Sequence, residues 1–270
     1  MKRVLMTGAA GDVAGKLRKL LKGVYPELRL SDIVVPPDLA KDEKFVQADL
    51  ADMAAVEEAV KGVDGVLHFG GVSVEKPWDT IHPANIVGCY NLFEAARRNK
   101  VKRVVFASSN HAVGFYRRSR RIGIGDPVRP DSRYGVSKAF GEALGALYAD
   151  KYGLGVMCIR IGNVTEKPAD RRRLSIWLHP EDLVQLLRIG LEHRDIGYEI
   201  VFGASDNARS WWDNAPAFRL GYVPKHKAED HLDHALAGQA KLPADPLGDI
   251  FEGGPFCSAE LAGEPAKRGG

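Results

Sequence analysis

A tyrosine and a lysine four positions apart could together remove a proton from a substrate hydroxyl. Tyr134 and Lys138 open and close the segment YGVSK, and residues four apart share one face of a helix. A phenol has a reference pKa of about 10 and is a poor base at neutral pH, but a nearby ammonium favours the phenolate. Ser109, at the end of an apolar run, could hydrogen-bond the same substrate oxygen. These three side chains could hold a hydroxyl while its carbon gives up a hydride.

A glycine-rich turn near the start of the chain could hold the acceptor of that hydride. Segment 7–15 reads TGAAGDVAG; it follows an apolar run and precedes an amphipathic one. Gly8 allows a tight turn, and Gly11 lets the backbone approach a pyrophosphate at the amino terminus of the next helix. Glycines occur in many loops, but a position between strand and helix is the context that dinucleotide binding requires. We expect Gly8, Gly11, Asp12 and Val13 to contact a dinucleotide.

Asp32 indicates which dinucleotide this is. It ends the second apolar run of the chain, and Ile33 follows it, so no basic residue stands beside it. A carboxylate at this position accepts hydrogen bonds from the adenosine ribose hydroxyls and repels a 2′-phosphate. A surface aspartate or a helix cap is the alternative, and the position at the end of the second run argues against it. The sequence therefore predicts NAD rather than NADP.

Two further groups of residues lie at the ends of apolar runs and belong to the predicted cofactor site. Asp49 and Leu50 follow the third run, where Asp49 could bond the adenine amino group or instead cap the next helix. The fourth run ends in Phe69, Gly70 and Gly71, and paired glycines let the backbone lie flat against a cofactor. Ligands of parallel α/β sheets bind at the carboxyl ends of the strands, which is where these residues are expected.

Short apolar runs alternate with longer amphipathic segments through residues 1–202. The runs typical of strands are 3–7, 28–32, 45–48, 65–69, 103–107, 156–161 and 199–202. The segments typical of helices are 12–22, 53–61, 83–99, 134–152 and 181–193. This alternation predicts an α/β fold, a doubly wound parallel sheet of the Rossmann type with helices on both faces.

The chain length of 270 residues fits a single domain with a small appendage. Segment 109–133 is long and rich in Gly, Pro and Arg, which is typical of a functional loop. We predict one NAD-binding domain over 1–270, with 163–178 and 204–270 forming a small substrate-facing cap. Residues 264–270 are expected to fray.

Composition argues against several classes of partner. The net charge of +3 is too small to indicate a nucleic-acid partner, and basic clusters such as 117–121 are typical of solvated faces. Cys89, Cys158 and Cys257 lie far apart, which predicts neither a metal site nor a disulfide framework. No apolar run reaches membrane-spanning length, and a strand pattern starts at once without a signal peptide. We therefore expect a cytoplasmic protein.

Taken together, these motifs resemble the extended short-chain dehydrogenases. The chain has the TGxxGxxA turn, Asp32, the Ser108–Ser109 pair and the Tyr134/Lys138 spacing in the same order. Within that superfamily, several stretches are similar to the uronate dehydrogenase family, so that the resemblance extends over nearly the whole chain. These stretches are 70–77, 106–111, 160–162, 174–177, 211–214 and 251–256.

The resemblance implies NAD-dependent oxidation of a hexuronate, such as D-glucuronate or D-galacturonate, at C1 to the aldarolactone. Tyr134 would take the hydroxyl proton, Lys138 would tune it, Ser109 would assist, and the protein would be a homo-oligomer. Implied substrate contacts are Ser73, Ser109, Asn110, His111, Tyr134, Asn163, Arg172 and Phe256, and further implied cofactor contacts are Asn85, Ser108, Tyr134, Lys138 and Ile161. Asn163 departs from the serine expected there, and Asn85 could instead be an exposed helix residue.

A uronate carries a carboxylate, for which arginine is the natural bidentate partner. Arg171, Arg172 and Arg173 follow the sixth apolar run, and the residues alone do not choose among them or exclude a solvated basic turn. The resemblance selects Arg172.

Two other functions remain open at this point. A sugar-nucleotide epimerase or dehydratase would need more room for a nucleotide diphosphate than the short segment after the last predicted strand provides. An NAD-sensing binding protein of the same fold would commonly lack the Tyr/Lys pair, which this chain keeps. The preferred uronate epimer stays open as well.

Overall fold

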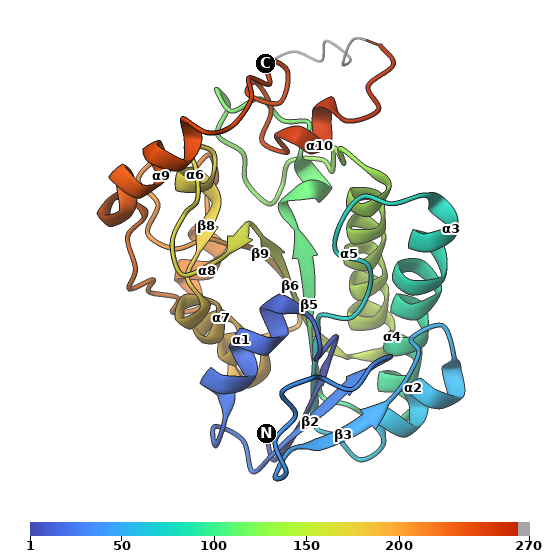
Figure 1. Ribbon diagram of the computed structural model, residues 1–270. Helices are drawn as coiled ribbons and strands as arrows, with labels where there is room; N and C mark the ends of the chain where they lie inside the picture. Colours follow the sequence, from blue (N-terminus) through green and yellow to red (C-terminus); the bar gives the residue numbers. More distant parts are fainter. Residues whose placement is uncertain (264–270) are drawn as a thin grey trace.

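The computed structural model describes residues 1–263, so the fraying expected of 264–270 lies outside the described part. Seven parallel strands form one sheet in the order β3-β2-β1-β4-β5-β6-β9 (Figure 1). The strands are β1 (Arg3–Thr7), β2 (Glu27–Asp32), β3 (Lys44–Gln47), β4 (Gly65–His68), β5 (Arg103–Ser109), β6 (Gly155–Ile161) and β9 (Tyr198–Gly203). The predicted doubly wound parallel sheet is confirmed.

Helices cover both faces of this sheet, as Figure 1 shows. One face carries α1 (Asp12–Leu21) and α7 (Pro180–Glu192), and the other carries α2 (Met53–Val60), α4 (Gly88–Arg98) and α5 (Arg133–Tyr152). Successive residues of β5 enter opposite cores: Val105 packs with α1 and α7, whereas Val104 and Phe106 pack on the other side. Burial on both faces explains why the strands read as continuous apolar runs.

The single helix predicted over 83–99 is wrong in its start and in its regularity. The helical region begins with α3 (Trp78–Ile81), passes through a π-helical turn at His82–Val87, and only then becomes α4. Pro83 has no amide hydrogen to continue the regular ladder, and its carbonyl accepts instead from the amide of Gly88, five residues on. The widened turn places Asn85 in the interior.

The order of the strands reverses at β1, which lies between β2 and β4. Such a reversal opens a crevice at the carboxyl ends of the two central strands. Gly8 follows β1 with a φ of +70°, and a Cβ there would lie 2.7 Å from the backbone nitrogen of Gly70, which follows β4. Both the conformation and the space therefore require glycine at position 8.

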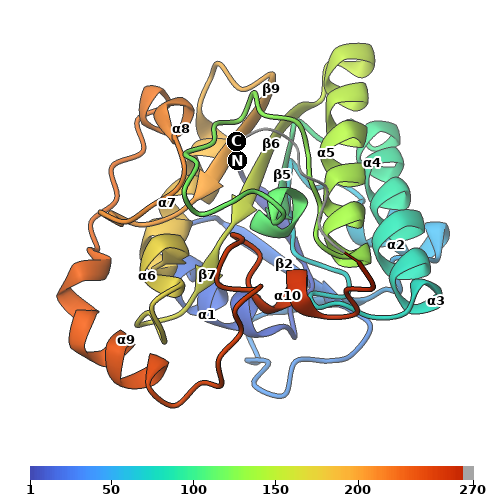
Figure 2. The same cartoon turned by 90° about the horizontal axis from the view of Figure 1, so that it is seen from above.

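The segments predicted as a cap contain short elements that the sequence did not reveal. They are β7 (Asn163–Val164), α6 (Arg173–Ile176), β8 (Trp177–Leu178), α8 (Ala215–Arg219), the 3-10 turn η3 (Ala228–His231), α9 (Leu232–Gln239) and α10 (Pro255–Ser258). Figures 1 and 2 show that α10 returns over the carboxyl end of β5, beside the 3-10 turn η2 (Asn110–Val113). Trp212 is buried and stacks on Phe202 at 4.7 Å, so it belongs to a core.

The three cysteines are buried. Cys89, Cys158 and Cys257 all carry free thiols. Across residues 1–263, no helix combines the length and the apolar character needed to cross a membrane.

The close packing of α5 on β5 leads to a first prediction. A Cβ at Gly141 would overlap the ring of Phe106, which His68 and Phe93 hold in place. We expect Gly141→Ala to lower the free energy of unfolding by about 1–3 kcal/mol, because overpacking forces buried neighbours to shift. Urea titration followed by circular dichroism measures the change.

Gly15 of α1 is the matched control, because a Cβ there meets nothing within 4 Å. Alanine is favoured over glycine in a helix by about 1 kcal/mol, so Gly15→Ala should stabilise the protein. Equal stabilisation by both substitutions would contradict the packing argument.

Candidate active site

A cleft of about 970 Å³ runs along the carboxyl ends of the central strands. It brings together every residue predicted for the site except Asn85. The predicted residues that line it are Gly8, Gly11, Asp12, Val13, Asp32, Asp49, Leu50, Phe69, Gly70, Gly71, Ser73, Ser108, Ser109, Asn110, His111, Tyr134, Lys138, Ile161, Asn163, Arg172 and Phe256. The cleft therefore joins the expected cofactor residues, the Tyr/Lys pair and the expected sugar contacts.

The turn after β1 has the form of an anion-binding site. Gly11 is the N-cap residue of α1, and no side chain caps the amides of that helix. A Cβ at Gly11 would approach the carbonyl oxygen of Gly8 to 3.1 Å, so the turn is compact. Free amides at a helix amino terminus favour a phosphate, which fits the pyrophosphate of a dinucleotide.

Asp32 is fixed by main-chain donors on both of its oxygens. Oδ2 accepts from the amide of Ala10 at 2.9 Å, and Oδ1 accepts from the amide of Ile33 at 2.7 Å. Two carboxylate oxygens offer about four acceptor positions, so both remain able to accept from ribose hydroxyls. Within residues 1–263, the lysines and arginines that line the cleft are Lys138, Arg172 and Arg173, and all three follow β4 in the sequence. This environment fits NAD.

The helix cap that was the alternative role for Asp49 belongs to Asp52 instead. Asp52 is the N-cap of α2 and accepts from the amides of Ala54 and Ala55. Asp49 closes a local turn by accepting from the amide of Ala51 at 2.9 Å, and it lines the cleft. Its predicted contact with adenine stays a prediction.

Asn85 lies behind the wall of the cleft rather than on it. Its Oδ1 accepts from the amide of Val72 at 2.7 Å, and its Nδ2 donates to the carbonyl of Val72 and to the Ser137 hydroxyl. The residue is buried, so the alternative of an exposed helix asparagine is wrong. Asn85 holds the backbone after Gly71 and ties it to α5 next to Lys138.

Tyr134 and Lys138 share one buried face of α5, as the spacing predicted. Lys138 Nζ lies 5.4 Å from the centre of the Tyr134 ring and donates to the Ala107 carbonyl at 2.8 Å. Burial lowers the pKa of Lys138 to about 8. Burial also raises the pKa of Tyr134 to about 12, and a hydrogen bond with the Ser109 hydroxyl opposes that rise. Desolvation dominates, so the pKa of the phenol is raised and not lowered as the neighbouring Lys138 led us to expect.

A buried ion pair, missed in the sequence, supports the face of α5 that carries Tyr134 and Lys138. Glu142 follows Lys138 by one helical turn and accepts from Arg160 at 2.9 Å on each of its oxygens. Its Oε1 also accepts from the hydroxyl of Ser108 at 2.6 Å, which links the end of β5 to α5 and β6. A charged residue on the same helix face as Tyr134 was the available sequence signal.

His111 is oriented by a buried carboxylate that the sequence analysis also missed. Its Nδ1 lies 2.7 Å from Oδ2 of Asp131, so Nδ1 carries a proton and Nε2 is the remaining polar atom of the ring. The imidazole stacks on Phe256 with ring centres 3.9 Å apart and meets Tyr134 edge-on at 5.8 Å. Two residues predicted as sugar contacts therefore form one surface beside the phenol.

Of the three adjacent arginines, Arg172 lines the cleft, and a main-chain carbonyl holds its guanidinium in place. Its Nε donates to the carbonyl of Glu252 at 2.7 Å. In the orientation of the Asn110 side chain that gives both of its amide atoms a hydrogen-bond partner, Oδ1 of Asn110 accepts from the Arg172 guanidinium at 3.2 Å. Arg173 also lines the cleft but pairs with Asp170, whereas Arg171 is exposed and lies outside the lining. Within residues 1–263, no carboxylate lies within salt-bridge distance of Arg172.

Glu252 lies beneath this arginine and is fully buried. Its Oε2 accepts from Nε1 of Trp212 at 2.8 Å, and its Oε1 has no hydrogen-bond partner. Desolvation raises the pKa of Glu252 to about 8, although Trp212 and Arg172 act in the opposite direction. The carboxyl group therefore carries a proton at neutral pH.

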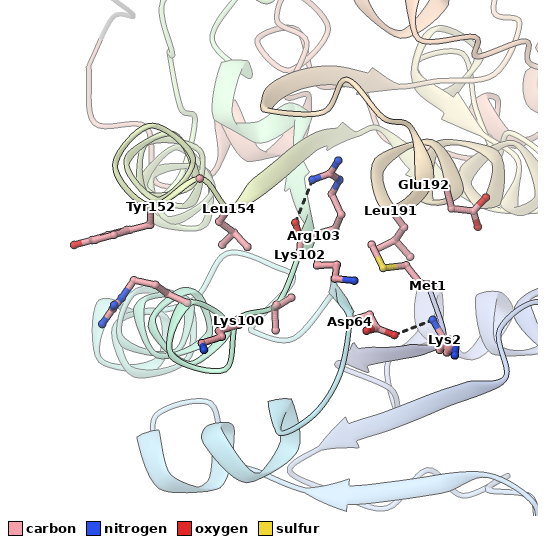
Figure 3. A pocket seen from close by; sticks show the side chains of 13 residues that line it. Met1, Lys2, Asp64, Lys100, Lys102, Arg103, Tyr152, Leu154, Leu191 and Glu192 are labelled. Atoms are coloured by element: carbon pink, nitrogen blue, oxygen red, sulfur yellow. Dashed lines mark hydrogen bonds between the residues drawn. The ribbon is translucent and has the colours of Figure 1, made fainter.

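A second hollow, of about 1070 Å³, lies at the opposite, amino ends of the strands (Figure 3). In Figure 3 the Lys2 amide donates to Asp64, and Arg103 donates to the Lys102 carbonyl. None of the predicted site residues, all of which lie in the described part of the chain, lines this hollow. Because parallel sheets bind ligands at their carboxyl ends, the cleft is the candidate site.

Comparison with known proteins identifies the class. The model of the NAD dependent epimerase/dehydratase family matches residues 4–175, so the chain belongs to that family. It is 46% identical to the uronate dehydrogenase of Pseudomonas putida over 95% of this chain and 96% of that one.

Two solved structures agree with this match. The glucuronic acid dehydrogenase of Chromohalobacter salexigens is 44% identical, with a TM-score of 0.91 over 96% of this chain and 97% of that one. A mutant uronate dehydrogenase from Agrobacterium tumefaciens complexed with NAD is 43% identical, with the same TM-score and coverage. The resemblance to uronate dehydrogenases is therefore confirmed.

The protonated state of Glu252 leads to a prediction about stability and pH. Its pKa is about 8 in the folded protein, against an ordinary value of 4.5. Between these values the folded state binds more protons than the unfolded state, so stability falls as pH rises. Glu252→Gln keeps a neutral side chain at every pH and removes this loss.

We expect the free energy of unfolding of Glu252→Gln, relative to the unaltered protein, to increase by roughly 1–3 kcal/mol between pH 5 and pH 8.5. Urea unfolding of both proteins at the two pH values measures this difference. Because both proteins carry the same other titrating groups, the contributions of those groups to the pH dependence cancel in the difference. A difference that does not change with pH would show that Glu252 is ionised in the folded protein.

Proposed function

We propose that this protein catalyses the NAD-dependent oxidation of a hexuronate, such as D-glucuronate or D-galacturonate, at C1 to the aldarolactone. The observation that carries the proposal is the position of Arg172. Its guanidinium has no carboxylate partner within the described residues, and it shares one cleft with Tyr134 and Asp32. The same cleft thus offers a cation for the substrate, a proton acceptor and a cofactor site.

Proton removal from the C1 hydroxyl is assigned to Tyr134. The hydroxyl proton passes to the phenolate oxygen, while the hydrogen on C1 leaves with both bonding electrons and the C1–O bond becomes a carbonyl. Bound NAD supplies the hydride acceptor and a positively charged ring. Ser109 donates a hydrogen bond to the same substrate oxygen and holds it against the phenol.

The buried phenol needs positive charge to ionise near neutral pH, because its surroundings, burial above all, raise its pKa to about 12. Lys138 supplies part of that charge, since its pKa of about 8 leaves it mostly protonated at pH 7. Its hydrogen bond to the Ala107 carbonyl holds the ammonium near the ring. Lys138 therefore acts on Tyr134 through its charge.

Recognition of the uronate is assigned to Arg172, whose Nε is already bonded to the Glu252 carbonyl. That bond fixes the plane of the guanidinium and leaves terminal N–H groups for a carboxylate. Asn110 follows Ser109 in the sequence, and its side-chain oxygen accepts from Arg172. Ser73, His111, Asn163 and Phe256 are the further sugar contacts that we propose from their places in the lining.

We further propose that the protein is a cytoplasmic homo-oligomer and has no nucleic-acid or membrane partner. Apolar side chains are exposed on the outer sides of α4 and α5, which lie side by side in Figures 1 and 2. They include Tyr90, Val136 and Leu147. Exposed apolar side chains grouped on neighbouring helices suit a contact between subunits.

NADH absorbance on mixing the protein with NAD and a uronate tests the proposed reaction. We expect turnover with D-glucuronate or D-galacturonate, and little with NADP, glucose or galactose. Tyr134→Phe keeps the ring but removes the proton acceptor, so kcat should fall about 100-fold or more. NAD binding without any turnover of uronates would leave the proposal untenable.

A set of arginine variants tests how the substrate carboxylate is bound. Arg172→Ala should lower kcat/KM for a uronate about 100-fold, because charged hydrogen bonds to the carboxylate are lost. Arg171→Ala is the matched control and should change kcat/KM less than about twofold, since exposed charges contribute little. Arg172→Lys should recover only part of the loss, because lysine lacks the planar fork. Similar losses in the Arg171 and Arg172 variants would place the carboxylate elsewhere.

A further inference from the structure

Two histidines and several carboxylates meet where α7 begins, on residues that the proposed reaction does not use. His179, Glu181 and His226 offer ligand atoms that all lie within 4.8 Å of one another. The two imidazoles stack with ring centres 3.5 Å apart and planes 20° apart. Glu166 adds a carboxylate oxygen 3.3 Å from Nε2 of His179. Such a mixture of nitrogen and oxygen donors is the kind that binds transition-metal ions.

Both nitrogens of His226 face carboxylates. Nδ1 lies 3.2 Å from Oδ1 of Asp182, as a charge contact without hydrogen-bond geometry, and Nε2 lies 3.5 Å from Oε2 of Glu181. A carboxylate only accepts, so each contact is favourable only when a proton or a cation occupies the nitrogen. A proton on Nδ1 and a metal ion at Nε2 satisfy both.

Asp182 is well placed to support a metal-bound imidazole. It is fully buried, and it also accepts from the Lys225 amide at 2.9 Å and the Ser205 hydroxyl at 2.6 Å. A carboxylate behind a ligating histidine fixes the tautomer and raises the basicity of the ligand nitrogen. This arrangement favours Nε2 of His226 as a ligand.

One divalent cation near both rings would balance the charge of the carboxylates around them, Glu166, Glu181 and Asp182. The lone pairs of imidazole lie in the ring plane, so the two stacked rings would turn apart to share the ion. The ion would replace the proton that Nε2 of His179 directs at Glu166. The proton of the neutral imidazole would then be on Nδ1, so the long 3.3 Å hydrogen bond from the Glu181 amide to Nδ1 would be lost.

We propose that His179, Glu181 and His226, together with Glu166, bind one divalent transition-metal ion. Zn²⁺ fits this donor set best, because it accepts two imidazoles and one or two carboxylates in a tetrahedron, whereas Mg²⁺ prefers oxygen donors alone. The histidines lie far apart in sequence, so no motif revealed them, and the cysteine spacing predicted no metal.

The site joins three separate parts of the fold. Glu166 follows β7, His179 and Glu181 start α7, and His226 precedes η3. An ion held by all of them ties both cap segments to a helix that covers the sheet. Metal bound to the folded protein alone stabilises it by mass action, so the ion has a structural role.

Titration of the untagged, EDTA-treated full chain with Zn²⁺ against a chromogenic chelator tests the site. We expect one Zn²⁺ per chain, a rise in the unfolding temperature on binding, and no competition by Mg²⁺. His226→Ala should weaken Zn²⁺ binding at least about 100-fold, and Glu166→Gln about 10-fold. His234→Ala, on an exposed histidine of α9, is the matched control and should bind as the unaltered chain does.

Glu166 is mostly exposed, so its substitution gives a readout that does not depend on folding of the His226 variant. Co²⁺ in place of Zn²⁺ should give visible absorption bands typical of tetrahedral coordination, and these bands should disappear in His226→Ala. Absence of saturable Zn²⁺ binding, or equal affinity in the His226, Glu166 and His234 variants, would overturn the proposal.

Discussion

The desolvation of polar side chains on the inner face of α5 is the constraint on which the cleft depends. Burying a charge is costly unless it is hydrogen-bonded or paired. Lys138 meets this requirement through the Ala107 carbonyl, and Glu142 meets it through Arg160 and Ser108. Each partner lies on β5 or β6, so satisfying the helix also fixes the end of β5, where Ser109 stands. The position of Tyr134 against Ser109 follows from those bonds.

The same burial sets the chemistry. A solvated phenol would need only a modest influence to ionise, but the buried Tyr134 has a pKa of about 12 and needs nearby positive charge. Lys138 alone does not overcome desolvation. In the proposed reaction, proton transfer would thereby be linked to the binding of a positively charged cofactor ring. Gly8 and Asp32, which we propose to hold NAD, would then contribute to the reactivity of the phenol although they are remote from the reacting carbon.

The parts of the structure that could be predicted from the sequence are those encoded by neighbouring residues. The turn at Gly8 and the spacing of Tyr134 and Lys138 are local patterns, and the apolar runs follow from burial on both faces of the sheet. The structure brings those residues into one cleft. Their individual contacts with NAD and sugar remain predictions.

The features that escaped prediction depend on partners far away in the chain. Asp131 orients His111 across a long loop, and Asn85 turned inward because a proline widened its helix. No local pattern carries that information. Glu142 is the exception, because its spacing from Lys138 placed it on the catalytic face and a charged residue there required a buried partner.

The substrate end of the cleft differs from the cofactor end in how it is assembled. The cofactor end uses turns that directly follow strands, whereas Arg172 is held by the main chain of Glu252, and Phe256 stacks on His111. A carbonyl fixes the guanidinium without neutralising it. An ionised Glu252 beneath Arg172 would compete with a substrate carboxylate for the same charge. Because burial raises the pKa of Glu252 to about 8, the positive charge of Arg172 stays available to the carboxylate of the proposed uronate substrate.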